Sequence, residues 1–159
     1  VFWTAANSLK IGTETFRDID NVVFENNDVL HAACALTIEI KEGSKTSNVK
    51  FINNRVETLG NISSGRILNF LVRSYIYTEQ KATIIDRPSY GQLTNVLIKD
   101  VMIEQLPEKQ SRSNISGFNE TSYIHNVVFD NFVIEGKKIT DPKQFNVRIG
   151  KFVEGLKFQ

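Results

Sequence analysis

The chain has 159 residues, which fits a single domain, with 41% hydrophobic and 23% charged residues as in a globular protein. A formal net charge of only +1 excludes the strongly basic surface of a nucleic-acid-binding protein, and no apolar run approaches the roughly 20 residues of a membrane span. Cys34 is the single cysteine, which excludes an internal disulfide framework, and its apolar surroundings (HAACAL) predict a buried, unreactive thiol.

The chain opens on VFWTAANSLKIG, an apolar and strand-like stretch without the features of a signal peptide. A solenoid needs a polar cap at each open end, and this stretch offers none. We therefore expect residues 1–159 to form a single β-helix domain that is the C-terminal part of a longer chain.

A two-part repeat sets the expected fold. The pattern Asn-Val-x-(Phe/Ile)-x-(Asn/Asp) starts at Asn21, Asn48, Asn95 and Asn126. Thirteen residues before each copy, a short strand-like run begins with a small residue, at Ser8 (SLKIG), Ala35 (ALTIE), Ala82 (ATIID) and Ser113 (SNISG). Self-similarity at this period, with alternating and β-branched residues, predicts an all-β solenoid.

The spacing of the copies predicts the number of coils. The starts lie 27, 47 and 31 residues apart, and 47 residues are too many for one coil. We expect an additional coil over residues 58–81, with GRILNFLVRSYIYT as its strand-rich part. The chain would then form about five to six coils of a β-solenoid, with the last one, FNVRIGKFVEGLKFQ, incomplete.

The first and last positions of the repeat predict two structural columns. Asparagine tolerates the left-handed backbone of a sharp turn, and stacked amides can bond to one another along a column. The first column contains Asn21, Asn48, Asn95 and Asn126, and the second contains Asn26, Asn53, Asp100 and Asn131. Phe24, Phe51 and Phe129 occupy one repeat position and are expected to stack in the interior.

Outward positions supply the candidate catalytic pair. In LTIEIK, the residues Leu36, Ile38 and Ile40 share one face of a strand, and Glu39 and Lys41 share the other. The fixed offset places Gly12, Glu39, Asp86 and Gly117 in one outward column. With one coil between them, Glu39 and Asp86 would be about 10 Å apart at the usual strand spacing, near the separation of an inverting glycosidase pair. The alternative is a solvated face with ordinary charges.

Other residues carry weaker signals. The exposed aromatic candidates for stacking on a sugar ring are Trp3, Tyr75, Tyr77 and Tyr90, of which Tyr90 lies in a Pro/Gly loop. His31 and His125 lack the neighbours of a metal site and are expected to be packed or solvent-facing. Three N-x-(Ser/Thr) triplets start at Asn61, Asn114 and Asn119, and they either accept a glycan in a secreted eukaryotic protein or arise by chance.

Four segments carry a resemblance to a known family. ANSLKIGTET (6–15), DIDNVVFENNDV (18–29), LTIEIKEG (36–43) and SNVKFINN (47–54) resemble the coils of pectin-lyase-like right-handed parallel β-helices. The similar enzymes are polygalacturonase-type (family 28) and dextranase-type (family 49) glycoside hydrolases, and YIHNVVFDNFVIEGKKI (123–139) resembles one of their terminal coils.

The resemblance implies a right-handed coil and an activity on polysaccharides. Lys41 matches the lysine of the family's I-R-I-K coil, which implies a contact with a substrate carboxylate. Asn7 stands where that family has histidine, and Glu39 stands where it has arginine. The family's catalytic aspartates belong to coils that precede this chain, and the two departures favour a neutral glycan.

We therefore expect part of a β-helical glycoside hydrolase that degrades a polysaccharide or oligosaccharide, without a metal or cofactor, secreted, periplasmic or at the cell surface. Glu39 and Asp86 would be the catalytic carboxylates. The substrate contacts would be Lys41, Lys10, Glu14, Tyr90 and Trp3. The alternatives are a non-catalytic β-helix, such as a carbohydrate-binding, adhesin or tailspike-like module, and a structural solenoid without a ligand.

Overall fold

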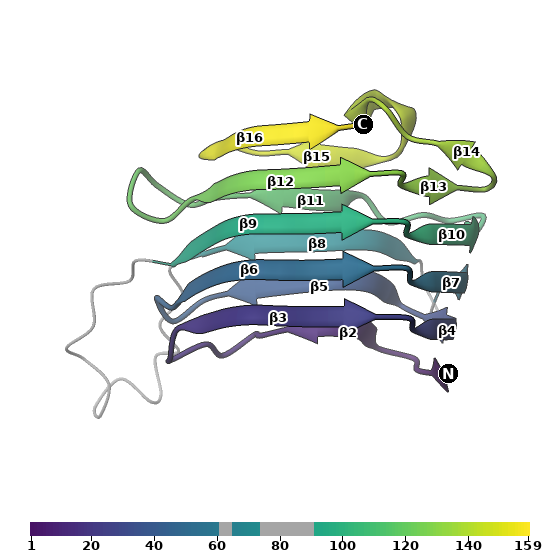
Figure 1. The fold of residues 1–159 in the computed structure, drawn as a ribbon, viewed down its shortest axis with the longest axis horizontal. Helices are drawn as coiled ribbons and strands as arrows, with labels where there is room; N and C mark the ends of the chain where they lie inside the picture. Colours follow the sequence, from purple (N-terminus) through teal and green to yellow (C-terminus); the bar gives the residue numbers. More distant parts are fainter. Residues whose placement is uncertain (61–64, 74–90) are drawn as a thin grey trace.

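The computed structural model describes residues 1–60, 65–73 and 91–159, and shows a β-solenoid of about four turns with 62% strand (Figure 1). Three sheets, here called A, B and C, run along its length. Sheet A contains β1 (Phe2–Trp3), β4 (Asp28–Ala32), β7 (Arg55–Leu59), β10 (Met102–Gln105), β13 (Val133–Ile134) and β14 (Lys137–Lys138). Sheet B contains β2 (Asn7–Ile11), β5 (Cys34–Ile40), β8 (Arg66–Val72), β11 (Ser113–Ser116) and β15 (Val147–Ile149). Sheet C contains β3 (Ile19–Glu25), β6 (Lys45–Ile52), β9 (Gln92–Lys99), β12 (Ile124–Asp130) and β16 (Val153–Phe158).

Each coil visits sheet B, then sheet C, then sheet A, so that a strand pairs with its equivalent one coil away. All these pairings are parallel except β13 with β14. In Figure 1 the strands of sheet C run one way in front, those of sheet B run back behind them, and the chain advances from β3 to β16. That path is right-handed, as parallel crossovers almost always are. The predicted all-β parallel solenoid is confirmed.

Helix is nearly absent. The one helix in the described part of the chain is the single 3₁₀ turn η1 (Pro142–Gln144). No helix within those residues is long and apolar enough to cross a membrane.

The core is a column of apolar side chains between the three sheets. Leu36, Ile38 and Ile40 are fully buried, as their alternation predicts. The rings of Phe24 and Phe51 stack with centroids 5.0 Å apart, which matches the spacing of neighbouring strands. The rings of Phe129 and Phe158 stack in the same way at 4.5 Å. Each predicted phenylalanine therefore stacks on a ring of the next coil, and Ile98 separates the two pairs.

The two predicted asparagine columns are also confirmed. All eight residues have positive φ, between 50° and 57°. In the first column, Asn126 Nδ2 donates to Asn95 Oδ1 and Asn95 Nδ2 donates to Asn48 Oδ1, each at 3.2 Å. In the second, Asn53 Nδ2 donates to Asn26 Oδ1 at 2.7 Å. In β3, β6, β9 and β12, the first column lies within the strand and the second lies at the turn into sheet A.

The additional coil predicted for the 47-residue spacing is wrong. β6 pairs directly with β9, with Val49 opposite Val96 and Phe51 opposite Ile98, so no coil lies between them. β8, which lies in the GRILNFLV segment, is the sheet B strand of the coil that continues into β9. The solenoid has about four turns rather than the predicted five to six. Residues 61–64 and 74–90, which the spacing includes, lie outside the described residues.

The register predicted for sheet B fails after the second coil. β5 pairs with β8, and β8 pairs with β11, whereas the ATIID run (82–86) lies outside the described residues. Ser113 also lies one residue later than predicted. Its neighbour Asn114 pairs with Asn69, which puts Ser113 at the inward position of Leu68, where it is fully buried. The column that begins with Glu39 therefore continues through Leu71 and Ser116 rather than through Asp86 and Gly117.

The first asparagine column generates a test of the left-handed turns. We expect Asn95→Ala to lower the free energy of unfolding by more than Asn95→Gly. Both variants lose the amide bonds to Asn48 and Asn126, but only alanine adds about 1–2 kcal/mol of left-handed strain. Urea unfolding of the three proteins measures the difference. Equal losses in both variants would contradict a requirement for positive φ at this position.

Candidate functional site

The outer face of sheet B carries a polar column that crosses every strand of the sheet. Successive pairings place Lys10, Thr37, Asn69, Asn114 and Arg148 side by side on β2, β5, β8, β11 and β15. We call this set the sheet B column. Thr37 and Asn69 are buried, Lys10 and Asn114 are half-buried, and Arg148 is exposed. The accessible parts of the column, at Lys10 and at Asn114 with Arg148, are therefore the candidate binding surface.

Glu39 lies two residues beyond Thr37 and connects neighbouring coils. Its Oε2 accepts a hydrogen bond from Thr13 Oγ1 at 3.2 Å, and its Oε1 accepts one from Asn69 Nδ2. Lys41 Nζ lies 3.8 Å from the same Oε2. The Glu39 side chain is still 17% exposed, so a ligand at this face can reach the carboxylate.

The contacts of Glu39 extend in both directions along the sheet. Lys10 Nζ donates to Thr13 Oγ1 at 3.1 Å, and Asn114 Nδ2 donates to Asn69 Oδ1 at 3.4 Å. A chain of polar contacts therefore joins Lys10, Thr13, Glu39, Asn69 and Asn114 across four strands. Each member orients the next one, which holds the donors and acceptors of this face in fixed positions.

Gly12 allows the close approach that this arrangement needs. Its φ is +96°, and a Cβ at this position would lie 2.0 Å from the carbonyl oxygen of Glu39. Any larger residue would push the turn that carries Thr13 away from β5. The glycine therefore brings Thr13 within hydrogen-bond distance of the Glu39 carboxylate.

Glu42 is a second carboxyl group at the same turn, and the sequence interpretation missed it. Its Oε2 accepts a hydrogen bond from the backbone N–H of Thr15 at 2.8 Å. Burial raises the pKa of Glu42, and the negative charge of Glu14 raises it further, while the bond from Thr15 opposes the shift. Glu42 follows the last residue of β5 by two positions, where the alternation that identified Glu39 has ended, so no pattern marked it.

A groove lies beside this carboxylate-bearing turn. Its volume is about 370 Å³, and Leu71, which is opposite Glu39, forms part of its wall. The residues that line it are Leu71, Val72, Arg73, Asn114, Ser116, Gly117, Phe118 and Arg148. This size suits a small organic ligand or a few units of a longer one. Asn114 and Arg148 belong to both the groove and the sheet B column.

The structure brings together three of the predicted site residues, Lys10, Glu39 and Lys41. Glu14 is exposed at the neighbouring turn, where it influences Glu42. Among the described residues, Leu71 and Ser116 continue the column of Glu39. Asp86 itself, with Tyr75, Tyr77 and Tyr90, lies outside the described residues.

Trp3 lies on β1 in sheet A and not at the sheet B site. Its ring is 65% exposed and stacks on His31 with centroids 5.4 Å apart. His31 Nδ1 is 2.9 Å from Thr58 Oγ1, so this histidine is packed rather than free. Trp3 therefore stays a prediction as a sugar contact, on a different sheet from the other candidates.

The remaining candidates form no metal or nucleophile site. His125 stacks on Tyr123, with centroids 4.0 Å apart, and its Nε2 is 3.5 Å from Glu154 Oε2. Within the described ranges no group of three or more metal-binding side chains is present. Cys34 is buried as predicted, and burial raises the pKa of its thiol to about 11, which keeps it protonated at neutral pH.

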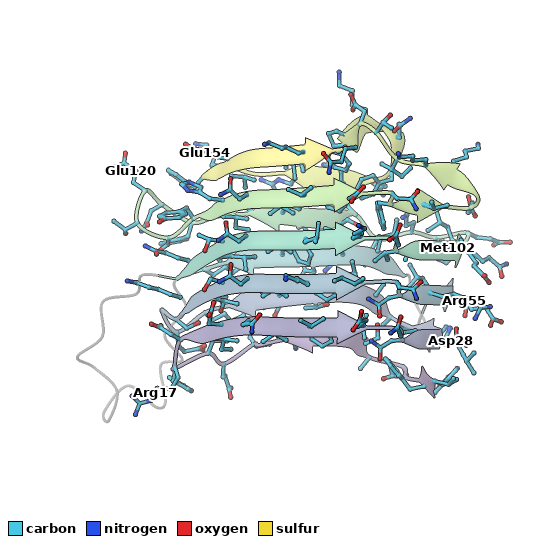
Figure 2. All side chains as sticks on the ribbon, viewed as in Figure 1. Arg17, Asp28, Arg55, Met102, Glu120 and Glu154 are labelled. Atoms are coloured by element: carbon cyan, nitrogen blue, oxygen red, sulfur yellow. The ribbon has the colours of Figure 1, made fainter. Side chains whose placement is uncertain are left out.

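Sheet A carries a charged cluster of a different kind. Arg55 Nε lies 2.7 Å from Glu104 Oε1 on the neighbouring strand β10, and its Nη2 lies 3.1 Å from Glu57 Oε2 on its own strand β7. Asp28 pairs with the same guanidinium, as Figure 2 shows on the adjacent strand. Glu104 and then Asp28 hold the pKa of Arg55 above its usual value. The cluster satisfies its arginine internally, so it gives no indication of a ligand.

Comparisons with family models, curated proteins and solved structures find no match to this chain. The parallel solenoid is a property of the structure, whereas the resemblance to pectin-lyase-like hydrolases stays a prediction. The functional interpretation must therefore come from the side chains of the site.

Glu42 generates a pH prediction. Because its pKa is raised in the folded protein, folding binds protons, and the free energy of unfolding falls as pH rises from the ordinary value of 4.5 through the raised value. We expect Glu42→Gln to remove this loss, so its stability relative to the unchanged protein increases across that window. Urea unfolding from about pH 4 to about pH 7 measures the difference, with the exposed Glu120→Gln as the control. A constant difference between Glu42→Gln and the unchanged protein would contradict the raised pKa.

Proposed function

We propose that this chain is part of a β-helical protein that binds a polysaccharide along the outer face of sheet B, with the groove as its main subsite. The observation that carries the proposal is the overlap of the sheet B column with the groove, at Asn114 and Arg148. Binding is the function that the described residues support best, and it corresponds to the carbohydrate-binding alternative of the sequence interpretation.

A linear glycan suits this surface for a geometric reason. The sheet B column carries an ammonium, a hydroxyl, two amides and a guanidinium at the regular strand spacing. The groups open to a ligand are the ammonium of Lys10, the amide of Asn114 and the guanidinium of Arg148. A chain of sugar units presents hydroxyl groups at regular intervals, and these act as donors and acceptors in turn. Phe118, which is 49% exposed at the groove, supplies the apolar surface for a ring face.

The charges of the groove favour an acidic glycan over the neutral one expected from the sequence. Arg73 and Arg148 both line it, and the lining includes no carboxylate among the described residues. A guanidinium binds a carboxylate or sulfate group through paired, charge-assisted hydrogen bonds. A uronate or sulfated saccharide therefore fits this proposal better than a neutral chain. Secretion or display at a surface, where such polymers occur, forms part of the same proposal.

Hydrolysis of the bound glycan is the second candidate function, and one observation favours it. Glu39 and Glu42 both contact the turn over residues 12–15, and burial raises the pKa of Glu42. A glycosidase needs one carboxyl group that keeps a proton and one that stays ionised. Glu42 would act as the general acid and Glu39 as its partner, and Asp86 stays a predicted catalytic residue.

The binding proposal predicts that removal of one positive charge from the groove lowers the affinity for an acidic oligosaccharide. We expect Arg148→Gln to weaken binding of a uronate oligosaccharide by about tenfold, because an ionic hydrogen bond contributes about 1.5 kcal/mol or more. Calorimetric titration with uronate, sulfated and neutral oligosaccharides of equal length measures it. Arg17→Gln is the matched control, since Arg17 is exposed and does not line the groove.

The comparison of Arg148→Gln with Arg17→Gln can contradict the proposal in two ways. If Arg17→Gln weakens binding as much as Arg148→Gln does, the attraction is general to the protein surface and the groove is not the site. If no saccharide of the panel binds, the proposed function is wrong.

The hydrolase candidate predicts that reducing ends are released and that kcat/KM depends on two carboxyl groups. Incubation with the bound glycan should release reducing ends, and Glu39→Gln and Glu42→Gln should each lower kcat/KM by about 100-fold or more. Asp86→Asn belongs in the same assay, with Glu120→Gln as the control. Binding without any release of reducing ends would reject hydrolysis and leave the binding proposal intact.

A further inference from the structure

The loop over residues 117–123, between β11 and β12, ends in a tight turn that stands clear of the sheets. Phe118 N donates to Ser122 O at 2.7 Å, and Ser122 N donates to Asn119 O at 3.1 Å, which closes the turn around Glu120 and Thr121. Both of those residues are exposed, and Figure 2 shows Glu120 at the tip of the loop, directed away from the solenoid. Asn119 beside them is half-buried, so another protein can reach the turn through Glu120 and Thr121 without any change in the sheets.

The turn contains an N-x-Thr triplet in a specific hydrogen-bonded arrangement. Asn119 Oδ1 accepts from both the backbone N–H and the Oγ1 hydroxyl of Thr121, each at 3.0 Å. Asn119 Nδ2 makes no hydrogen bond to another residue of the described ranges. A hydroxyl that donates to the amide oxygen stabilises the imidate form of the amide, in which the nitrogen carries a nucleophilic lone pair.

We infer that Asn119 is an acceptor site for an N-linked oligosaccharide. In the transfer, Asn119 Nδ2 attacks the anomeric carbon of a lipid-diphosphate-linked oligosaccharide. A C–N bond forms, the bond between that carbon and the phosphate oxygen breaks, and the lipid diphosphate leaves. The amide proton passes to a base of the transferase. The inference needs secretion of the chain, but it does not depend on glycan binding at sheet B.

Asn114 starts a second triplet, and its environment excludes the same role in the folded protein. Its Nδ2 donates to Asn69 Oδ1 and to the backbone carbonyl of Arg112, both at 3.4 Å. Asn114 also lies within β11 and lines the groove. A glycan on this nitrogen would break the polar chain of sheet B. The third triplet, at Asn61, lies outside the described residues.

Expression of the full chain behind a cleavable secretion leader in a eukaryotic cell line tests the inference. The secreted protein is digested, and peptides are mapped by mass spectrometry before and after treatment with peptide N-glycosidase. We expect the peptide with Asn119 to carry an oligosaccharide, and the peptide with Asn114 to carry none. An unmodified Asn119 in the secreted protein overturns the inference.

Two small side-chain changes separate the triplets. Thr121→Ala should abolish modification of Asn119 while it leaves the asparagine in place, and Ser116→Ala, which disables the triplet of Asn114, should leave that modification unchanged. Thermal unfolding should be the same for the glycosylated and enzymatically deglycosylated proteins, because the hydrogen bonds of the Asn119 side chain stay within its own turn. Modification that survives Thr121→Ala would also overturn the proposed role of the triplet.

Discussion

The left-handed backbone at two positions in each of four successive coils is the constraint on which the rest of the solenoid depends. The first position lies within the sheet C strand, and the second begins a connection of two residues into sheet A that has the same length in all four coils. Because the turn is identical each time, equivalent residues stack directly above one another. The phenylalanine stack, the amide columns and the polar column of sheet B all follow from that alignment.

Residues that repeat were predictable from the sequence, and residues that do not repeat were not. Asn48, Asn95 and Phe51 recur at fixed positions, so their columns follow from the order of the residues alone. The spacing rule failed at Ser113 because it counts residues, whereas hydrogen bonding between β5, β8 and β11 decides which residues are neighbours. Of the seven predicted site residues, the structure brings Lys10, Glu39 and Lys41 together and places Trp3 on another sheet.

The part of the site that was missed depends on contacts between segments without a common pattern. Glu42 acquires its raised pKa from burial against the turn that contains Thr15, and no single stretch of sequence encodes that burial. Arg73 directly follows β8 and Arg148 lies on β15, so the two cations of the groove are far apart in the chain. Arg55 in sheet A differs from these two groove arginines. Carboxylates on the adjacent strands already pair with it, so it needs no external anion.

The unequal spacing of the repeats has a consequence for how such a protein can change. β6 and β9 keep their pairing although 47 residues separate their asparagines, where the previous coil uses 27. Doubling the length of a connection costs only about 0.6 kcal/mol in closure entropy. The corner between sheets B and C, which the chain enters at the groove residue Arg73, is therefore open to insertion and deletion during evolution. The corner between sheets C and A keeps one length in four successive coils. Specificity for new ligands could be acquired at the permissive corner without loss of the scaffold.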